Sequence, residues 1–416
     1  MNYDIVIIGA GFAGLSLAYH LPKNMSVLVL DMKPNLDAHT ESTGLITEAT
    51  YGLFEEMIDP SKFVPNKITT IGVVGTDYKK MFFSHTKNPW IYSTSTPALL
   101  KHLAENLPKN VHVKIACHFT SYKVHENEKF PVTVAYLSDG KTFLTSCRFI
   151  VGADGANSKV ALCNKNLSKN KKFLVGMEKV FFGEIKLGAV PDKTVYHFWF
   201  GAFSLGYGGW LSPTVIDGKS AFRLGLAKLK KDASDLKKID LFIKTLLQEK
   251  IIEITPDAKE ILTFSSPIPI GGPVRNFYDK YSMLIGDAGG FCGAFAADGI
   301  KGAIISAKVA AKLIPAYLDG DTQALKHLHK NIEMESRLMT YYRKQLLYRF
   351  LWNRMNSNRS FDLLFEIISR QKETFLQQFC DSKDRNKSLV FSVLRLRNLP
   401  LLFSYAFSLF LDLFDL

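Results

Sequence analysis

The pattern of apolar and polar residues opens with two buried strands that flank a helix. Residues 5–8 are uniformly apolar, which is typical of a strand covered on both faces of a sheet. Residues 9–14 form a glycine-rich turn, and residues 15–21 have a helix-like composition. Residues 26–30 form a second apolar run that ends on Asp31. The pattern therefore predicts a strand, a glycine turn, a helix and a second strand that ends in an acid.

Two later apolar runs also end in polar turns. Residues 148–152 lead into Asp154, and residues 281–285 lead into Asp287, after which small residues predict a helix over about 298–313. In an open α/β sheet, ligands lie against the carboxyl ends of the strands. We therefore expect Asp154 and Asp287 to converge on one elongated cofactor.

The middle of the chain is strand-like and its end is helical. Residues 194–200 are aromatic and residues 222–226 alternate, which favours a largely antiparallel sheet. Beyond residue 321 the chain reads as helical and basic. Residues 398–411 are uncharged and rich in Leu and Phe, but the run is too short to span a bilayer. Such a segment either lies in a membrane interface or packs on a core.

Composition narrows the class of protein. The chain has 416 residues, of which 47% are hydrophobic and 22% charged, so it is globular rather than disordered or fibrous. Its length predicts two or three domains. The formal net charge of +13 favours anionic partners such as nucleotide phosphates or lipid surfaces. The basic residues are dispersed and no nucleic-acid module is recognisable, so we expect no nucleic-acid partner.

No metal site or disulfide framework is predicted. The five cysteines are scattered and contain no CxxC pair. His327 and His329 lack an HExxH context, and we interpret both as surface residues. The first strand begins at once and leaves no room for a signal peptide. We expect a cytoplasmic protein, with peripheral membrane contact as the alternative.

The first glycine turn has the residues that a dinucleotide site needs. Gly9 allows a tight turn, Gly11 allows backbone N–H groups to approach a pyrophosphate, and Gly14 allows the helix to pack closely on the strand. An acid at the end of the second strand accepts hydrogen bonds from the ribose of the adenosine half. The predicted contacts of this segment are Gly9, Gly11, Phe12, Ala13, Gly14 and Asp31.

The three turns together resemble the flavin motifs of FAD-dependent enzymes of the p-hydroxybenzoate hydroxylase type, over roughly residues 1–320. The resemblance implies that FAD is bound and that Asp287 contacts its ribityl chain. It also implies that Gly286 shapes this turn and that Gly299 and Ile300 lie against the isoalloxazine ring. A helix N-terminus carries roughly half a positive charge, which would stabilise the anionic reduced flavin.

Within that class, three segments are most similar to the geranylgeranyl reductase family. They are the stretch IPIGGP at residues 268–273, the turn GDAGGF at residues 286–291 and the helix start at residues 297–304. The archaeal reductases tend to have a cysteine beside the flavin, where this chain has Thr43 followed by Gly44. By the resemblance, both residues lie near the cofactor.

A fourth segment resembles the aromatic motif that lines the isoprenoid cavity of these reductases. The resemblance implies substrate contacts for Tyr207, Trp210 and Pro213, although the spacing of Tyr207 and the presence of Ser212 depart from the family pattern. The alternative is a strand whose Trp210 packs in the core.

The resemblance implies an α/β fold with a Rossmann-like FAD-binding domain, an inserted antiparallel β-sheet substrate domain and a C-terminal helical region. The expected boundaries are 1–50, 93–174 and 266–320 for the FAD-binding domain, 51–92 and 175–265 for the substrate domain, and 321–416 for the helical region.

The implied activity is that of an FAD-dependent reductase that saturates C=C bonds of a geranylgeranyl-type isoprenoid lipid. An FAD-dependent monooxygenase or halogenase of the same fold is the first alternative. A flavin-bound lipid carrier or a non-redox enzyme related to carotenoid cyclases is the second. NADPH or another reductant would supply the electrons. The sequence identifies no catalytic residue.

Overall fold

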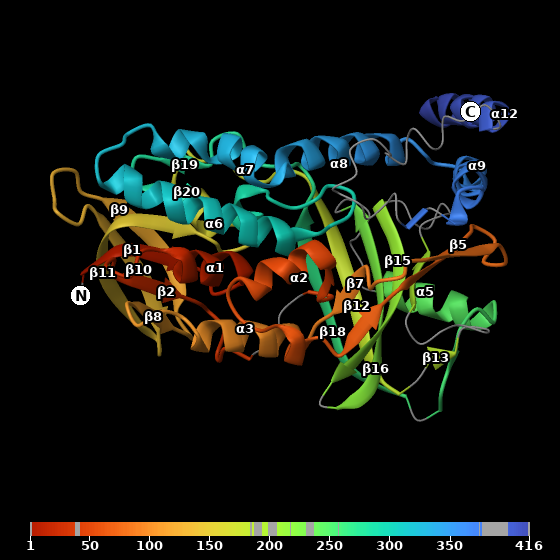
Figure 1. The fold of residues 1–416 in the computed structure, drawn as a ribbon, viewed down its shortest axis with the longest axis horizontal. Helices are drawn as coiled ribbons and strands as arrows, with labels where there is room; N and C mark the ends of the chain where they lie inside the picture. Colours follow the sequence, from red (N-terminus) through yellow and green to blue (C-terminus); the bar gives the residue numbers. More distant parts are fainter. Residues whose placement is uncertain are drawn as a thin grey trace.

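The computed structural model describes residues 2–37, 42–183, 185–186, 194–198, 206–216, 218–229, 237–256, 258–373, 375–376 and 398–414. Two large sheets lie toward opposite ends of the long axis of the molecule, and the C-terminal helices run along one side of both (Figure 1). Residues 199 and 200 of the predicted aromatic strand lie outside the described residues.

The first sheet has a parallel centre, as the uniformly apolar runs predict. Strand β1 (Asn2–Ile8) pairs in parallel with β2 (Val27–Leu30) and with β11 (Lys141–Gly152). Every residue of β2 is buried, as its uniformly apolar run predicts, and α1 packs against it. The eight-stranded sheet is completed by β8 (Val111–Lys114), β9 (His118–Val124), β10 (Val132–Ser138), β19 (Tyr278–Asp279) and β20 (Ser282–Leu284).

Two helices that begin at the predicted turns pack against each other on this sheet. They are α1 (Phe12–His20) and α6 (Gly299–Leu318). Helix α6 starts where the sequence predicts but continues past residue 313, although Pro315 lies in its last turn. The other helices of this part are α2 (Glu48–Glu55), α3 (Thr96–Glu105) and α4 (Lys159–Cys163).

The second sheet has seven strands and is antiparallel except where β14 pairs in parallel with β5. Helix α5 (Lys237–Gln248) covers one face, where Phe242 packs against Phe198. The strands, in the order of the sheet, are β18 (Lys259–Pro269), β12 (Phe173–Phe182), β16 (Lys219–Leu229), β15 (Gly206–Ile216), β14 (Thr194–Phe198), β5 (Thr70–Val74) and β6 (Met81–His85).

Two small sheets complete the β structure that the described residues form. The three-stranded one contains β3 (Leu45–Thr47), β7 (Ile91–Ser93) and β4 (Asn66–Ile68), and the two-stranded one contains β13 (Ile185–Lys186) and β17 (Glu253–Ile254).

The chain then continues as helices, as predicted. These are α7 (Leu328–Ser336), α8 (Leu338–Trp352), α9 (Asn358–Ser369) and α12 (Leu399–Leu413). Within the described ranges, none of the helices combines the length and the apolar character that crossing a bilayer requires. The predicted fold class is confirmed: a Rossmann-like α/β part, an inserted antiparallel sheet and C-terminal helices. The predicted domain boundaries stay a prediction.

The interpretation of His327 and His329 as surface residues holds for His327 only, because His329 is half-buried. His327 is exposed, but the ring of His329 lies 4.4 Å from the ring centre of Phe277 and 5.8 Å from that of Phe291. Residues two apart on a helix point in different directions, so only one of the two histidines faces solvent. Burial lowers the pKa of His329.

Candidate functional site

The structure brings the three predicted turns into backbone contact. Gly9 has a φ of 106°, and a Cβ atom at this position would collide with the carbonyl oxygen of Ala153, in the turn that contains Asp154. Gly286 has a φ of 56°, and a Cβ atom there would lie 2.7 Å from the Cβ of Ala13. The first turn is therefore held between the other two by glycine at both contact points.

The N-terminus of α1 faces open space. A Cβ atom at Gly11 would meet no heavy atom within 4 Å, and no side chain caps the helix. A Cβ atom at Gly14, by contrast, would collide with the carbonyl oxygen of Gly9. The first N–H groups of a helix need acceptors, and the partial positive charge at this end attracts anions. The geometry fits a bound pyrophosphate.

Asp31 fixes the glycine turn from the end of β2. Its carboxylate accepts hydrogen bonds from the backbone N–H groups of Ala10 and Lys33, the latter at 2.8 Å. Each carboxylate oxygen can accept more than one hydrogen bond, so acceptor capacity for a ribose hydroxyl is left. The side chain of Phe12 points away to α2, where its ring lies 5.4 Å from that of Phe54.

Thr43 and Gly44 lie in a segment that two distant elements hold. Gly44 has a φ of 65°, and its carbonyl accepts hydrogen bonds from the backbone N–H of Thr94 and from the Oγ1 of Thr94, each at 2.9 Å. From the seven-stranded sheet, Arg223 donates a hydrogen bond to the carbonyl of Ser42 at 3.1 Å. The half-buried Thr43 thus lies between a residue held by the seven-stranded sheet and a residue held by the loop after β7.

The two predicted aspartates lie in environments that disfavour charge. Asp154 accepts a hydrogen bond from the N–H of Val160 at 3.1 Å, while its buried Oδ1 has no hydrogen-bond partner in the structure. Burial raises the pKa of Asp154, and it raises the pKa of Asp287 to about 6. A Cβ atom at Gly299 would lie 2.8 Å from Oδ1 of Asp287, so this carboxylate lies against the start of α6. An acceptor without a donor is what the hydroxyls of a ribityl chain would satisfy.

Helix α8 holds the loop that leads into α6. The sequence did not predict this contact. Oε1 of Gln345 accepts hydrogen bonds from the N–H groups of Phe295 and Ala296, at 3.0 and 2.7 Å. Nε of Arg349 donates to the carbonyl of Ala294 at 2.8 Å. The only signal in the sequence was the mixture of aromatic and basic residues in this helix.

Trp210 belongs to a buried polar group on the face of the second sheet opposite α5. Its indole N–H donates to Oε2 of Glu178 at 3.0 Å, and Arg223 donates to Oε1 of Glu178 at 3.3 Å. Trp210 is 7% exposed. Burial raises the pKa of Glu178, while the charge of Arg223 opposes that shift. Glu178 and Arg223 were missed, although a charged residue inside an apolar strand is a visible signal.

The other two predicted substrate contacts lie on the same strand, β15. Pro213 is half-buried, and Tyr207 lies near the start of the strand, where the structure describes no side chain.

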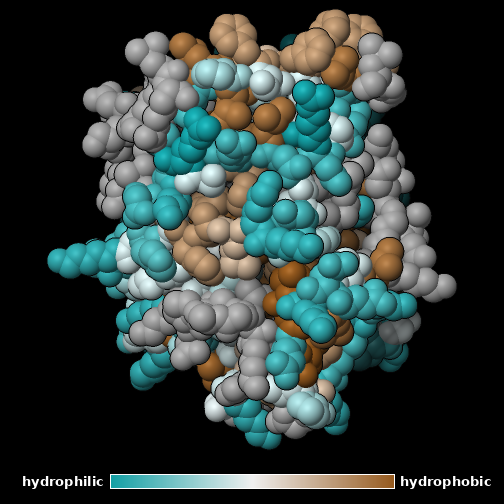
Figure 2. All heavy atoms as spheres, turned by 90° about the vertical axis from the view of Figure 1, so that its right-hand side faces the viewer, coloured by the Kyte–Doolittle hydropathy of each residue, from teal (hydrophilic) through white to brown (hydrophobic). Residues whose placement is uncertain are grey.

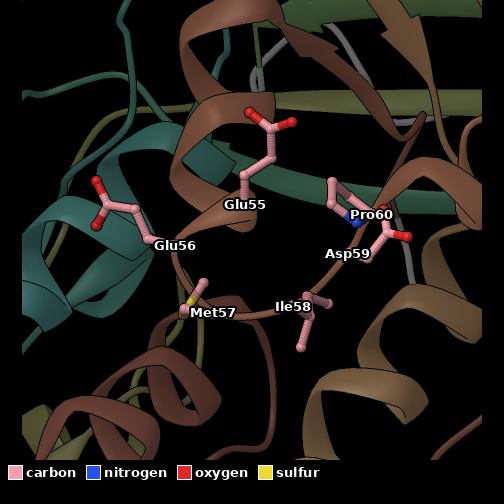
Figure 3. A pocket seen from close by; sticks show the side chains of 6 residues that line it. All are labelled: Glu55, Glu56, Met57, Ile58, Asp59 and Pro60. Carbon is pink, nitrogen blue, oxygen red and sulfur yellow. The ribbon is translucent and has the colours of Figure 1, made fainter.

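A hollow at the end of α2 is separate from the three turns. Six consecutive residues line it, from Glu55 to Pro60 (Figure 3), and none is a predicted site residue. Glu55, Glu56 and Asp59 make it acidic, which is unfavourable for a phosphate-bearing ligand.

Comparison with known proteins supports the class that this geometry defines. A profile of the FAD dependent oxidoreductase family matches residues 4–64. A digeranylgeranylglycerophospholipid reductase of Methanococcus aeolicus is 25% identical over 83% of this chain and 84% of its own length. The protein of the same name from Methanocaldococcus jannaschii is 24% identical over 88% of this chain and 90% of its own length.

Solved structures share the fold. A geranylgeranyl bacteriochlorophyll reductase-like protein of Thermoplasma acidophilum has a TM-score of 0.77 at 16% identity, over 100% of this chain and 99% of its own. A p-nitrophenol 4-monooxygenase of Pseudomonas putida has a TM-score of 0.67 at 12% identity, over 91% and 97% of the two chains.

The fold and the three converging turns define an FAD-dependent oxidoreductase, and the comparisons confirm that class and its cofactor. The particular resemblance predicted from the sequence, to the geranylgeranyl reductases, is also confirmed.

Substitutions at Gly11 and Gly14 should affect different properties: FAD binding at Gly11 and folding stability at Gly14. We expect Gly11→Ala to leave the thermal stability of the FAD-free protein nearly unchanged, because the space there is open, and to weaken FAD binding at least about tenfold by filling the pyrophosphate position. Gly14→Ala should lower the free energy of unfolding by roughly 1–3 kcal/mol, because its Cβ collides with backbone. Thermal unfolding and FAD titration of both variants check this, and equal FAD affinity in Gly11→Ala would contradict it.

The buried ion pair of Glu178 and Arg223 gives a second prediction, about the free energy of unfolding. Glu178→Gln should cost roughly 3–5 kcal/mol in the free energy of unfolding, because it leaves the charge of Arg223 buried without its counterion. The control is Asp240→Asn, which removes an exposed partner of Lys179 and should cost less than about 1 kcal/mol. Urea unfolding of the two variants measures the difference.

Proposed function

We propose that this protein is an FAD-dependent reductase that saturates C=C bonds of a geranylgeranyl-type isoprenoid lipid. The observation that carries the proposal is the contact of all three flavin turns around the uncapped start of α1. The relatives named digeranylgeranylglycerophospholipid reductases, which align over most of both chains, support the choice of reaction and substrate.

The residues of the three turns would hold FAD along its length. Gly9 and Gly11 would border the pyrophosphate together with the backbone of Phe12 and Ala13, Gly14 would let the helix approach the turn closely, and Asp31 would lie on the ribose. Asp154, Gly286 and Asp287 would lie along the ribityl chain, and Thr43 and Gly44 beside the ring system. Gly299 and Ile300 present the first N–H groups of α6. Asp298, the residue at the N-cap position, makes no side-chain cap hydrogen bond.

The protein's own contribution is to orient the substrate and exclude water. When bound and reduced, FAD supplies a hydride. The start of α6 favours negative charge on the bound ring system. The face of the second sheet that bears Trp210 would hold the alkene. Pro213 pairs with Phe222, which packs on the α5 side, so Pro213 lies on the other face of the sheet. A fixed, dry arrangement lowers the entropic cost of the reaction.

A monooxygenase or halogenase is the second candidate, because such enzymes share the fold. A variant of a flavin-dependent brominase has a TM-score of 0.59 at 18% identity, over 97% of this chain and 98% of its own. This similarity is lower than that to the reductase-like protein. A lipid carrier without redox chemistry is the third candidate, and redox cycling during substrate consumption would exclude it.

NADPH or another reductant would supply the electrons. The sequence has no second glycine fingerprint, so we propose a transiently bound donor. Loss of flavin absorbance on mixing with NADPH under anaerobic conditions would identify a nicotinamide, and bleaching only with dithionite would indicate a different donor.

We further propose that α12 rests on a membrane surface. In this helix polar side chains face the protein and apolar ones face solvent, the reverse of an ordinary surface helix. Ser408 and Asp412 are buried, and Asp412 accepts a hydrogen bond from the N–H of Asn356 at 3.0 Å. Phe403 is 74% exposed. Apolar side chains gather along the top of the face that Figure 2 shows, on the side where α12 lies in Figure 1. The exposed apolar residues are Leu399, Phe403, Phe407, Phe410, Leu413 and Phe414.

An amphipathic helix of this length suits the interface of a bilayer rather than its interior. A lipid with geranylgeranyl chains resides in the bilayer, so this contact would place the protein beside its substrate. The net charge of +13 would add attraction to anionic lipid.

The reaction can be tested by flavin absorbance. We expect the purified protein to show oxidised-flavin bands that bleach on anaerobic photoreduction and return when a geranylgeranyl lipid is added, with a product heavier by two hydrogens. A product that gains oxygen or halogen, and only in the presence of oxygen, would replace the reductase by the second candidate. A protein that stays colourless with added FAD would contradict both.

Vesicle flotation tests the membrane surface. The triple variant Phe403→Ser, Phe407→Ser, Phe410→Ser should lose at least about tenfold in partitioning to vesicles of phosphatidylcholine and phosphatidylglycerol, because burial of each Phe contributes roughly 1.5–3 kcal/mol. Leu144→Ser, which changes an equally apolar and 67% exposed residue on β11, is the control and should partition normally. Equal partitioning of the triple variant would overturn the proposal.

A further inference from the structure

Asp298 carries an unsatisfied carboxyl oxygen at the place where the ring system of the cofactor would lie. It directly precedes Gly299 and Ile300 at the start of α6. Oδ2 of Asp298 accepts a hydrogen bond from the hydroxyl of Tyr341 at 2.8 Å. Oδ1 is buried and has no hydrogen-bond partner in the structure. A buried acceptor without a hydrogen-bond donor is rare in native proteins and needs a physical explanation.

The backbone around Asp298 is shaped to hold this side chain. A Cβ atom at Gly293 would collide with Oδ1, so only glycine leaves room for the carboxyl group. Ala297 adopts a φ of 55°, in the left-handed region, and its N–H donates to the carbonyl of Gly293 at 2.9 Å. Such a conformation is strained in a residue with a side chain, and strain of this kind concentrates at functional sites.

Helix α8 fixes the same loop from the other side. Gln345 accepts the N–H groups of the two residues before Ala297, and Tyr341, one turn earlier on α8, donates to Asp298. Helix α8 therefore holds both the carboxyl group, through Tyr341, and the loop before it, through Gln345. A group so fixed can act on a reacting atom without a further loss of conformational entropy.

The groups that face Asp298 determine its protonation. On α6, Lys301 is near enough to favour the charged form, and its Nζ lies 5.2 Å from the ring centre of Tyr341. On α8, the hydroxyl of Tyr341 also favours the charged form, while Tyr342 packs beside it. Asp287 and Cys292 also border this loop, and so does the charged Arg349 of α8, which donates to the carbonyl of Ala294. Desolvation outweighs these effects, so burial raises the pKa of Asp298 above its usual value.

We propose that Asp298 donates the proton that completes the reduction of the alkene, and that Tyr341 is its positioning residue. This proposal rests on the proposed function. Reduced FAD, when bound, would supply a hydride to one alkene carbon, and the neighbouring carbon would then need a proton as the π bond is lost. The O–H bond of Asp298 breaks, and a C–H bond forms at that carbon.

The charges balance in this scheme. The alkene gains one hydride and one proton, the cofactor loses two electrons, and Asp298 becomes a carboxylate. That carboxylate is stabilised by the hydroxyl of Tyr341 and by the charge of Lys301, and it recovers a proton from water after the product leaves.

The test uses two Asp→Asn variants at opposite ends of α6. Asp298→Asn removes the acid and keeps the shape of the side chain, whereas Asp319→Asn changes the exposed residue at the C-terminal end. Photoreduced holoenzyme is mixed anaerobically with phosphatidylcholine vesicles that contain a geranylgeranyl lipid. We expect reoxidation of the flavin by the alkene to be at least about 100-fold slower in Asp298→Asn and unchanged in Asp319→Asn.

A second readout does not depend on turnover. The infrared spectrum of the FAD-free protein should contain a band component from the protonated carboxyl group of Asp298 that Asp298→Asn lacks and Asp319→Asn retains. In Tyr341→Phe the midpoint of its titration should move to higher pH, because the carboxylate loses a hydrogen-bond donor. The pH above which alkene-dependent reoxidation falls should move upward by the same amount.

The outcomes separate the two proposals. If the alkene fails to reoxidise the wild-type flavin, the proposed function is wrong. If the wild type is reoxidised and Asp298→Asn reacts equally fast, Asp298 is not the proton donor and the proposed function stands. If Asp298→Asn cannot bind FAD, Tyr341→Phe decides, and an unshifted titration and pH profile in that variant would overturn the role of Asp298.

Discussion

Close backbone contact between three turns is the constraint on which the rest of this structure depends. Gly9 touches Ala153 on one side of the first turn, and Ala13 touches Gly286 on the other. The distances leave no room for a side chain at either glycine. Because the strands before these turns lie side by side in one parallel sheet, the turns meet at the same edge. The start of α1 stays uncapped there, and its N–H groups have open space before them. The site for an elongated anionic cofactor follows from this packing.

The second constraint is that buried polar groups must find partners, and here they find them across elements. Arg223 joins Glu178 within the seven-stranded sheet and also reaches the carbonyl of Ser42, beside the predicted flavin contacts. Gln345 and Arg349 bind the loop before α6 from the C-terminal helices. The seven-stranded sheet and the C-terminal helices therefore both hold segments that adjoin the three turns, because unpaired polar groups in these positions would be costly.

The need of buried polar groups for partners also explains the exposed apolar face of α12. Ser408 and Asp412 form hydrogen bonds with residues in and just before α9. The Phe and Leu side chains on the other side of α12 are therefore exposed to solvent. A protein that acts on a lipid has a use for such a face.

The sequence by itself determined the local features: the apolar strands, the glycine turns and the acids that end them. These depend on residues close together in the chain, and glycine is informative because only it tolerates a φ such as 106° at Gly9. It could not show that Glu178 would pair with Arg223, or that Tyr341 would hold Asp298, because these partners come from separate elements. It also gave no sign that His329 would turn inward onto Phe277. Only tertiary packing decides which polar group reaches which partner, because the distance between two side chains is set by how elements meet and not by their separation along the chain.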